Sequence, residues 1–287
     1  MQTVIQSKTK AVKIDNQGIF TIIGESINPT RRKKLIETLQ ARDFEYVREL
    51  AVTQIQSGAD ILDVNVGFPG VDDVSLLPEV VKFLNENFDI PLCLDSPNPK
   101  AIAAGLAVAP ARTLVNSVNG EEKSLNALLP IIKEFGAVVI GLVMDDNGIP
   151  NDAEGRTSIA EKILERAEKS GIPHSDVVID PIVMAVSADT GAALATLQTI
   201  EMVHRSFGVN IILGASNVSF GLPDRDTINQ NFLALAMYAG ASCAITNPVK
   251  ATSSIRAVDL LMGRDQYASR FIKNFRLQQK AMETAKH

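Results

Sequence analysis

Residues 91–95 read PLCLD, a short apolar run of β-strand type that ends in a carboxylate. The pattern recurs along the chain, in which apolar runs repeatedly end in Asn, Asp or Glu. Such runs lead into Glu25 and Asn28, Asp63 and Asn65, Asp95, Asn116, Asp180, Asn217 and Asn247. One such ending is an ordinary strand-to-loop junction, but its recurrence on nearly every strand describes a rim lined with hydrogen-bonding side chains. A parallel (β/α)8 barrel places its working residues on that rim.

Segments with a helical pattern alternate with these apolar runs. We expect helices over residues 43–57, 74–87, 100–107, 121–135, 153–170, 192–207 and 227–239. Eight strand candidates lie around them, including residues 138–143, and eight β-α repeats over about 250 residues match a TIM barrel. The competing topology, an open doubly wound sheet, normally carries a Gly-rich phosphate loop after its first strand. Residues 24–28, GESIN, are not such a loop.

Two further segments frame the predicted barrel, and we expect all of residues 1–287 to form one domain. Residues 1–18 predict an N-terminal extension, a short hairpin that closes the barrel's base. Residues 266–287 predict an extra C-terminal helix that is basic and amphipathic, because basic and apolar side chains are interleaved there. We expect this helix to pack against the barrel or a second subunit, with binding of an acidic partner as the alternative.

Composition limits the class of protein. Of the 287 residues, 46% are hydrophobic and 21% are charged, which allows a sizeable core and argues against global disorder. A net charge of −5 argues against a general nucleic-acid binder. No apolar stretch approaches the roughly 20 residues of a membrane helix, and the N-terminus lacks the layout of a secretion signal. These features indicate a soluble cytoplasmic protein without a membrane partner.

Cysteine and histidine positions bear on metal chemistry. Cys93 and Cys243 fall within predicted strands, so we expect both to be small buried core residues. His174, His204 and His287 have no ligand spacing and are expected at the surface. A zinc site with nitrogen and sulfur ligands is therefore not expected. The many carboxylates leave an all-oxygen Mg²⁺ or Ca²⁺ site open.

Three of the strand-end residues suit a flat heterocycle. Asp95, Asn116 and Asp180 are expected to point into a common mouth. Carboxylates accept hydrogen bonds, and amides both accept and donate them. A pterin is complementary to this set, because its N3–H and 2-amino group suit a carboxylate and its remaining edge suits an amide. The alternative is that these residues cap the following helices, but their recurrence on most strands favours a polar site.

Six motifs occur in order at the ends of predicted strands: GESIN (24–28), DVNVG (63–67), LDS (94–96), NSVN (116–119), IDP (179–181) and GASNVS (214–219). Together they resemble the pterin-binding methyltransferases that exchange a methyl group between tetrahydrofolate and a corrinoid protein. The resemblance covers roughly residues 21–247. The folate module of cobalamin-dependent methionine synthase is similar more loosely. Dihydropteroate synthase shares this type of barrel, but its phosphate-binding signature is not evident here.

The resemblance implies a role for each matching residue. Asp95, Asn116 and Asp180 would hold the pterin ring, and Asn217 would be the catalytic residue that hydrogen-bonds near the methyl-bearing N5. Residues that would support the ring's surroundings or the first strand's mouth are Asp63, Asn65, Glu25 and Asn28. Arg225 would reach the pterin or the partner. Phe220 would offer an apolar wall, with core packing as the alternative.

The chemistry poses a leaving-group problem, since N5 must gain positive character as its methyl group departs. The nucleophile would be Co(I) of a reduced corrinoid. Asn217 is neutral, so it would stabilise protonated N5 or bind a water that delivers the proton. The reaction runs in either direction. Resemblance to components of bacterial demethylation systems favours transfer from methylcorrinoid to tetrahydrofolate over transfer from 5-methyltetrahydrofolate to cob(I) corrinoid.

The chain is expected to need a separate protein that carries the corrinoid. No corrinoid-binding Asp-x-His-x-x-Gly motif is evident, so the cobalamin is expected on a separate corrinoid protein that docks transiently over the barrel mouth. The resemblance also implies a homodimer. Three rival functions are a dihydropteroate synthase-like activity, a Mg²⁺-dependent barrel enzyme such as an aldolase or hydrolase, and a folate-binding scaffold without turnover.

Overall fold

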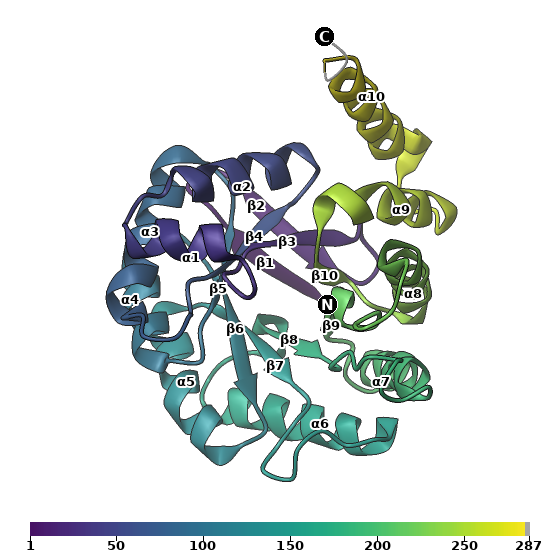
Figure 1. The fold of residues 1–287 in the computed structure, drawn as a ribbon. Coiled ribbons are helices and arrows are strands. Elements are labelled where there is room, and N and C mark those ends of the chain that lie inside the picture. Colours follow the sequence, from purple (N-terminus) through teal and green to yellow (C-terminus); the bar gives the residue numbers. More distant parts are fainter. Residues whose placement is uncertain (285–287) are drawn as a thin grey trace.

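The computed structural model describes residues 1–284 and contains a closed barrel of eight parallel strands (Figure 1). The strands are β3 (Thr21–Ile27), β4 (Ile61–Asn65), β5 (Leu92–Asp95), β6 (Leu114–Asn119), β7 (Val138–Leu142), β8 (Val177–Asp180), β9 (Asn210–Gly214) and β10 (Cys243–Thr246). They follow one another around the barrel, and β10 closes it by pairing with β3. This topology confirms the TIM barrel and excludes the open doubly wound sheet.

The helices surround the barrel (Figure 1). They are α1 (Lys33–Gln40), α2 (Glu45–Gln56), α3 (Asp73–Asn87), α4 (Pro99–Val108), α5 (Glu122–Phe135), α6 (Ala153–Lys169), α7 (Ala192–Phe207), α8 (Arg225–Ala239), α9 (Pro248–Leu261) and α10 (Ser269–Thr284). Sequence reasoning did not predict α1 and α9. In α9 the charged residues Arg256 and Asp259 are buried and pair with each other, which obscures the amphipathic period. In α1 the N-cap is Arg32, which makes no side-chain capping hydrogen bond.

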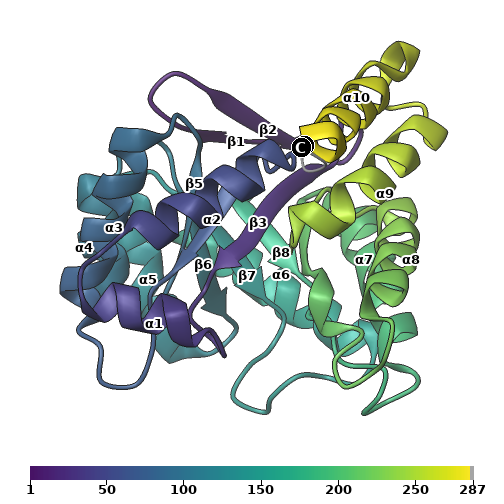
Figure 2. The ribbon, with the colours of Figure 1, turned by 45° about the horizontal axis from the view of Figure 1, so that its top comes forward.

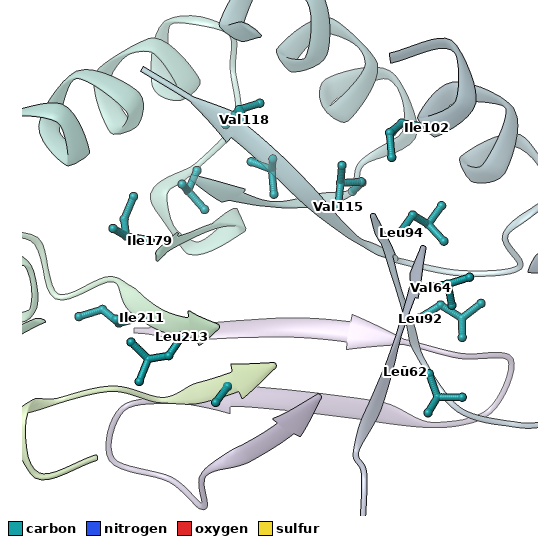
Figure 3. Close-up of a cluster of buried hydrophobic side chains, with 14 of the residues drawn as sticks. Leu62, Val64, Leu92, Leu94, Ile102, Val115, Val118, Ile179, Ile211 and Leu213 are labelled. Atoms are coloured by element: carbon teal, nitrogen blue, oxygen red, sulfur yellow. The ribbon is translucent and has the colours of Figure 1, made fainter. Parts of the chain in front are cut away.

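Alternating residues divide the barrel into two apolar clusters. Outward-facing strand residues, including Leu62, Leu94, Val115 and Leu213, pack against the helices (Figure 3). Inward-facing residues fill the lumen: Ile23, Ile61, Cys93, Leu114, Val138, Ile140, Val178, Ile212 and Cys243. Both cysteines are buried and free, in agreement with the sequence analysis. The packed lumen makes the barrel a solid core rather than a pore.

A hairpin of β1 (Gln2–Gln6) and β2 (Ala11–Asp15) closes the base of the barrel. Its Ile5 and Ile14 side chains are fully buried in the same cluster as the lumen residues. The buried Asn210 at the start of β9 fixes the hairpin, because its Nδ2 donates to the Ile14 carbonyl at 2.9 Å. Figure 2 shows the hairpin at one end of the molecule and α1 at the other.

The C-terminal helix α10 follows α9 and projects away from the barrel (Figure 1). Arg270 donates to Asp60, and the Asn274 and Gln278 amides donate to the hydroxyl of Ser253 on α9. His174 and His204 are partly exposed, while His287 lies outside the described residues. No helix within residues 1–284 is both long and apolar enough to cross a membrane.

Candidate active site

The polar rim continues the inward-facing positions of the barrel strands. Side chains alternate along a strand, so the lumen residue Ile61 is followed on the same face by Asp63 and then Asn65. The same step of two residues gives four further pairs: Ile23 and Glu25, Cys93 and Asp95, Leu114 and Asn116, and Val178 and Asp180. The lumen is therefore apolar at its base and becomes polar at the carboxyl ends of the strands.

These side chains surround a cavity of about 450 Å³ at the barrel mouth. All but two of the predicted site residues line it: Glu25, Asn28, Asp63, Asp95, Asn116, Asp180, Asn217 and Arg225. The two exceptions are Asn65 and Phe220. Loop residues that sequence reasoning missed also line the cavity, and these are Thr30, Arg32 and Ser216. No strand period marks loop residues, although the basic run at 31–34 was a visible signal.

Asn65 does not line the cavity but contacts Asp95, which does. It lies opposite Asp95 in the register of β4 and β5, and Asp95 lies opposite Asn116 on β6. The Asn65 Nδ2 donates to Oδ2 of Asp95 at 2.8 Å, and its Oδ1 accepts from the Gly67 N–H at 2.7 Å. Both ends of the amide are thus engaged, and Asn65 orients the carboxylate of Asp95.

Asp63 is the most deeply buried carboxyl of the site, with 3% of its surface exposed. Burial raises its pKa well above the usual range, and the nearby carboxylate of Asp95 raises it further. Its Oδ1 is buried and has no hydrogen-bond partner among the described residues. Buried polar atoms are normally paired, so this atom is available to a group bound in the cavity that Asp63 lines.

The remaining carboxyl groups also have raised pKa values. Burial raises the pKa of Asp180 from 3.8 to about 7, against the opposing effects of the Ile182 N–H and Arg156. Burial likewise raises the pKa of Asp95, which the hydrogen bond from Asn65 partly offsets. The pKa of Glu25 is raised by burial, while the Ser216 hydroxyl that donates to it at 3.0 Å lowers it. Desolvated acids of this kind are typical of functional sites.

The loop after β9 brings Asn217 and Arg225 to the cavity. Gly214 ends β9, and a Cβ added there would lie 3.2 Å from the Asn217 Nδ2, so the missing side chain makes room for this amide. Arg225 donates to the Ser216 carbonyl at 2.7 Å and to the Ser219 hydroxyl at 3.0 Å, which fixes the loop. The Asn217 amide is exposed and makes no side-chain hydrogen bond to the part of the chain described here.

The structure decides between core packing and an exposed position for Phe220, and between helix capping and a cavity position for Asn247. Phe220 is 49% exposed on the rim, so core packing is the wrong interpretation for it. The Asn247 Oδ1 accepts from the Val249 N–H at 3.0 Å and caps α9, as the capping interpretation predicts. Asp95 and Asn116 cap no helix; Asn98 caps α4, and Glu121 precedes α5. Most of the strand-end residues therefore line the cavity, while Asn247 caps a helix.

The sequence was also compared with known proteins. The model of the pterin-binding enzyme family matches residues 24–247. The chain belongs to this family. A methylcorrinoid:tetrahydrofolate methyltransferase of Eubacterium limosum is 32% identical over 89% of the chain and 96% of its own length. Methionine synthase of Mycobacterium tuberculosis is 28% identical over 86% of the chain, which spans only 22% of that protein. These relatives make the chain a methyltransferase.

Solved structures agree with the fold of this pterin-binding enzyme. Dihydropteroate synthase of Yersinia pestis superposes with a TM-score of 0.69 over 92% of the chain and 100% of its own, at 15% identity. Dihydropteroate synthase of Xanthomonas albilineans superposes with a TM-score of 0.67 over 91% of this chain and 98% of its own chain, at 18% identity. At such identities the likeness shows the barrel alone.

The cavity of this pterin-binding enzyme is lined mainly by groups that accept hydrogen bonds. Its volume lies within the range of small-molecule sites. It presents carboxyl oxygens at Asp95 and Asp180, an amide at Asn116, and the unpartnered Oδ1 of Asp63. Within residues 1–284, no three His, Cys, Asp or Glu side chains are grouped to hold a metal ion. Carboxyl and amide oxygens of this kind accept hydrogen bonds from N–H and NH₂ groups.

Proposed function

We propose that this enzyme transfers a methyl group between N5 of tetrahydrofolate and a corrinoid carried by a separate protein. The observation that carries the proposal is the convergence of Asp95, Asn116 and Asp180 on one cavity with Asn217 at its edge. The name of the Eubacterium limosum relative supports corrinoid and folate as the reactants.

The pyrimidine side of the pterin is proposed to bind deepest. Ionised Asp95 and Asp180 accept hydrogen bonds from N3–H and the 2-amino group, and Asn116 pairs with the remaining edge. Asp63 completes this floor, because burial raises its pKa and so favours the protonated form, which can donate as well as accept. Asn65 makes no direct contact with the pterin in this scheme, and its hydrogen bond holds Asp95 in place.

N5 then lies next to Asn217. When tetrahydrofolate N5 attacks the methyl carbon, the N5–carbon bond forms as the cobalt–carbon bond of the corrinoid substrate breaks, and the corrinoid leaves with the bonding electron pair. N5 becomes positively charged and then loses its proton to solvent. The Asn217 side-chain oxygen, or a water held by it, accepts a hydrogen bond from this N5–H. This contact strengthens only as charge develops, which is the kind of interaction that raises the rate. Glu25 and Arg225 set the surroundings, the first from β3 and the second by fixing the loop that carries Asn217.

The proposed physiological direction is from methylcorrinoid to tetrahydrofolate. The name of the 32% identical relative, which covers nearly the same length, supports it. The reverse direction, from 5-methyltetrahydrofolate to cob(I) corrinoid, uses the same residues. Stopped-flow absorbance with free methylcobalamin and tetrahydrofolate, and with cob(I)alamin and 5-methyltetrahydrofolate, measures both rates. Absence of any cobalt absorbance change in either mixture would reduce the protein to a folate-binding scaffold.

Isothermal titration with tetrahydrofolate in EDTA separates the pterin site from a metal-dependent barrel. We expect binding to survive chelation, whereas a strict need for Mg²⁺ would favour an aldolase or hydrolase. Formation of dihydropteroate from a pterin pyrophosphate and 4-aminobenzoate tests the synthase-like alternative. We expect no product, because the fold is all that the solved synthases support.

The assembly is proposed to be a homodimer of one-domain chains in the cytoplasm, without nucleic-acid or membrane partners. Leu235 and Tyr238 on α8 are 57% and 84% exposed, which supports burial of this face against a second copy. The corrinoid protein is proposed to dock over the barrel mouth, where N5 is reached. Analytical ultracentrifugation of the wild type and of Tyr238→Glu tests the dimer, and a monomeric wild type would contradict it.

A further inference from the structure

Two arginines at the barrel mouth have no role in the scheme above. The run TRRKK at residues 30–34 covers the end of the loop after β3 and the first two residues of α1. Figure 2 places α1, which begins within this run, at the end of the molecule opposite the hairpin. The run therefore lies on the rim of the cavity, and Arg32 itself lines the cavity.

The four charges of this run differ in their partners. Lys33 pairs with Glu37 at 3.7 Å, and Lys34 pairs with Glu49 at 3.5 Å. Arg31 and Arg32 form no ion pair within 4 Å in the described range 1–284, although the charge of Arg32 acts on Glu25 and lowers the pKa of that carboxyl, which burial raises. Arg32 donates one hydrogen bond, to the Ser26 carbonyl at 2.9 Å. Two guanidinium groups at the edge of the cavity thus retain donors for an anion.

Arg31 is held in a defined position across the mouth. Its backbone has a φ of 59°, in the left-handed region that residues other than glycine seldom adopt. Its guanidinium lies 5.2 Å from the ring centroid of Phe220, which comes from the loop after β9. This cation–π contact joins the loops that follow β3 and β9. The arginine pair and the exposed Phe220 face therefore form one patch beside Asn217.

We propose that Arg31 and Arg32 bind the carboxylates of the substrate's tail, the aminobenzoyl-glutamate of tetrahydrofolate, while Phe220 contacts its aromatic ring. This inference rests on the proposed function. The tail is attached at C6, the atom next to N5, so a pterin with N5 at Asn217 directs its tail toward this side of the mouth. Added γ-linked glutamates bring further carboxylates to the same two guanidinium groups.

The test compares three ligands by anaerobic isothermal titration: 6-methyltetrahydropterin, which lacks the tail, tetrahydrofolate with one glutamate, and tetrahydrofolate with three. The variant is R31A/R32A. We expect its Kd to rise on the order of 10-fold for tetrahydrofolate, more for the triglutamate, and less than about twofold for the tail-less pterin. Added salt should weaken tetrahydrofolate binding to the wild type more than it weakens tail-less pterin binding.

Two further variants separate charge from position and from general effects. R31K keeps the charge but loses the planar group over Phe220, so we expect a Kd between those of the wild type and the double variant. R205A is the matched control, because it removes an exposed arginine near the end of α7, and it should leave all three Kd values unchanged.

Equal losses for the tailed and tail-less ligands, or no loss for either, would overturn the inference while leaving the proposed function intact. So would a variant that changes only the KM for the corrinoid protein, since the patch would then bind an acidic partner. Failure of the wild type to bind any of the three ligands would overturn the proposed function, and this inference with it.

Discussion

The Asn65 amide nitrogen donates a 2.8 Å hydrogen bond to the Asp95 carboxylate, which lies opposite it on the neighbouring strand. Burial raises the pKa of Asp95, and this hydrogen bond counteracts the effect because it stabilises the charged form. The two residues thus act as a unit in which Asp95 lines the cavity and Asn65 orients its carboxylate and favours its charged form.

Asn65→Ala should therefore weaken tetrahydrofolate binding although Asn65 does not line the cavity. Without the amide, the pKa of Asp95 rises further and less of it is ionised at pH 7. We expect a several-fold larger Kd at pH 7 that recovers toward the wild-type value as the pH rises. Titration calorimetry between pH 6 and 9 measures this. A pH-independent loss would mean that Asn65 only shapes the site.

Asn247→Ala provides the contrasting case of a strand-end asparagine that caps a helix. Loss of its bond to the Val249 N–H should lower the free energy of unfolding by about 1 kcal/mol. The expected fall in Tm is about 2–4 °C for a chain of this size. Tetrahydrofolate affinity should not change, and a large change in Kd would move Asn247 into the binding site.

The pKa of Asp180, about 7, predicts pH-dependent binding. The pterin N–H groups need the ionised carboxylate, so the Kd for tetrahydrofolate should fall as the pH rises from 6 to 8. In Asp180→Asn we expect weaker binding, a shallower pH dependence and an intact fold by circular dichroism. Unchanged affinity in the variant would remove Asp180 from the binding site.

The same pKa predicts an effect on stability with a definite sign. The unfolded carboxyl ionises near its ordinary value, whereas folded Asp180 stays protonated up to about pH 7. Between these values the folded state binds more protons, so this group's contribution to stability decreases as the pH rises. Asp180→Asn should therefore gain Tm relative to the wild type between pH 4 and 8. A constant difference across that range would contradict the raised pKa.

Asn217→Ala should lower catalytic efficiency by on the order of 10²-fold or more, as the loss of one preorganised hydrogen-bonding group often does. The Kd for tetrahydrofolate should change much less, because the contact strengthens only as N5 gains charge. Stopped-flow methyl transfer and calorimetry measure the two quantities. Turnover at the wild-type rate would exclude Asn217 from the mechanism.

Gly214→Ala tests whether the position of the Asn217 amide matters. The new Cβ would stand 3.2 Å from Nδ2, which is tight enough to displace the amide by a few tenths of an ångström. We expect a roughly tenfold fall in kcat/KM with a small effect on Tm. Gly191→Ala is the control, because its added Cβ makes an ordinary contact of 3.4 Å with Asp189. Equal losses in both variants would point to a general effect on folding.

Much of the site was predictable because strand periodicity is local. A step of two residues from a lumen position such as Cys93 gives Asp95, and the order of strands brings Asn116 beside it. Loop residues carry no such period, and Arg32 and Ser216 were missed for that reason. The helix α9 was missed because Arg256 and Asp259 are buried, which breaks the expected amphipathic pattern. Their charges are paired with Asp60 and Arg264, which only the folded chain brings near them.

The amino-acid order alone determined the barrel, its polar rim and the family resemblance, since alternation along strands and the sequence of motifs are properties of the chain itself. Only the tertiary structure decided that Asp63 is almost fully buried where it lines the cavity, that Asn65 faces Asp95, and that burial raises the pKa of Asp180 to about 7. Desolvation and hydrogen-bond partners depend on distances between segments far apart in the chain, and packing sets those distances.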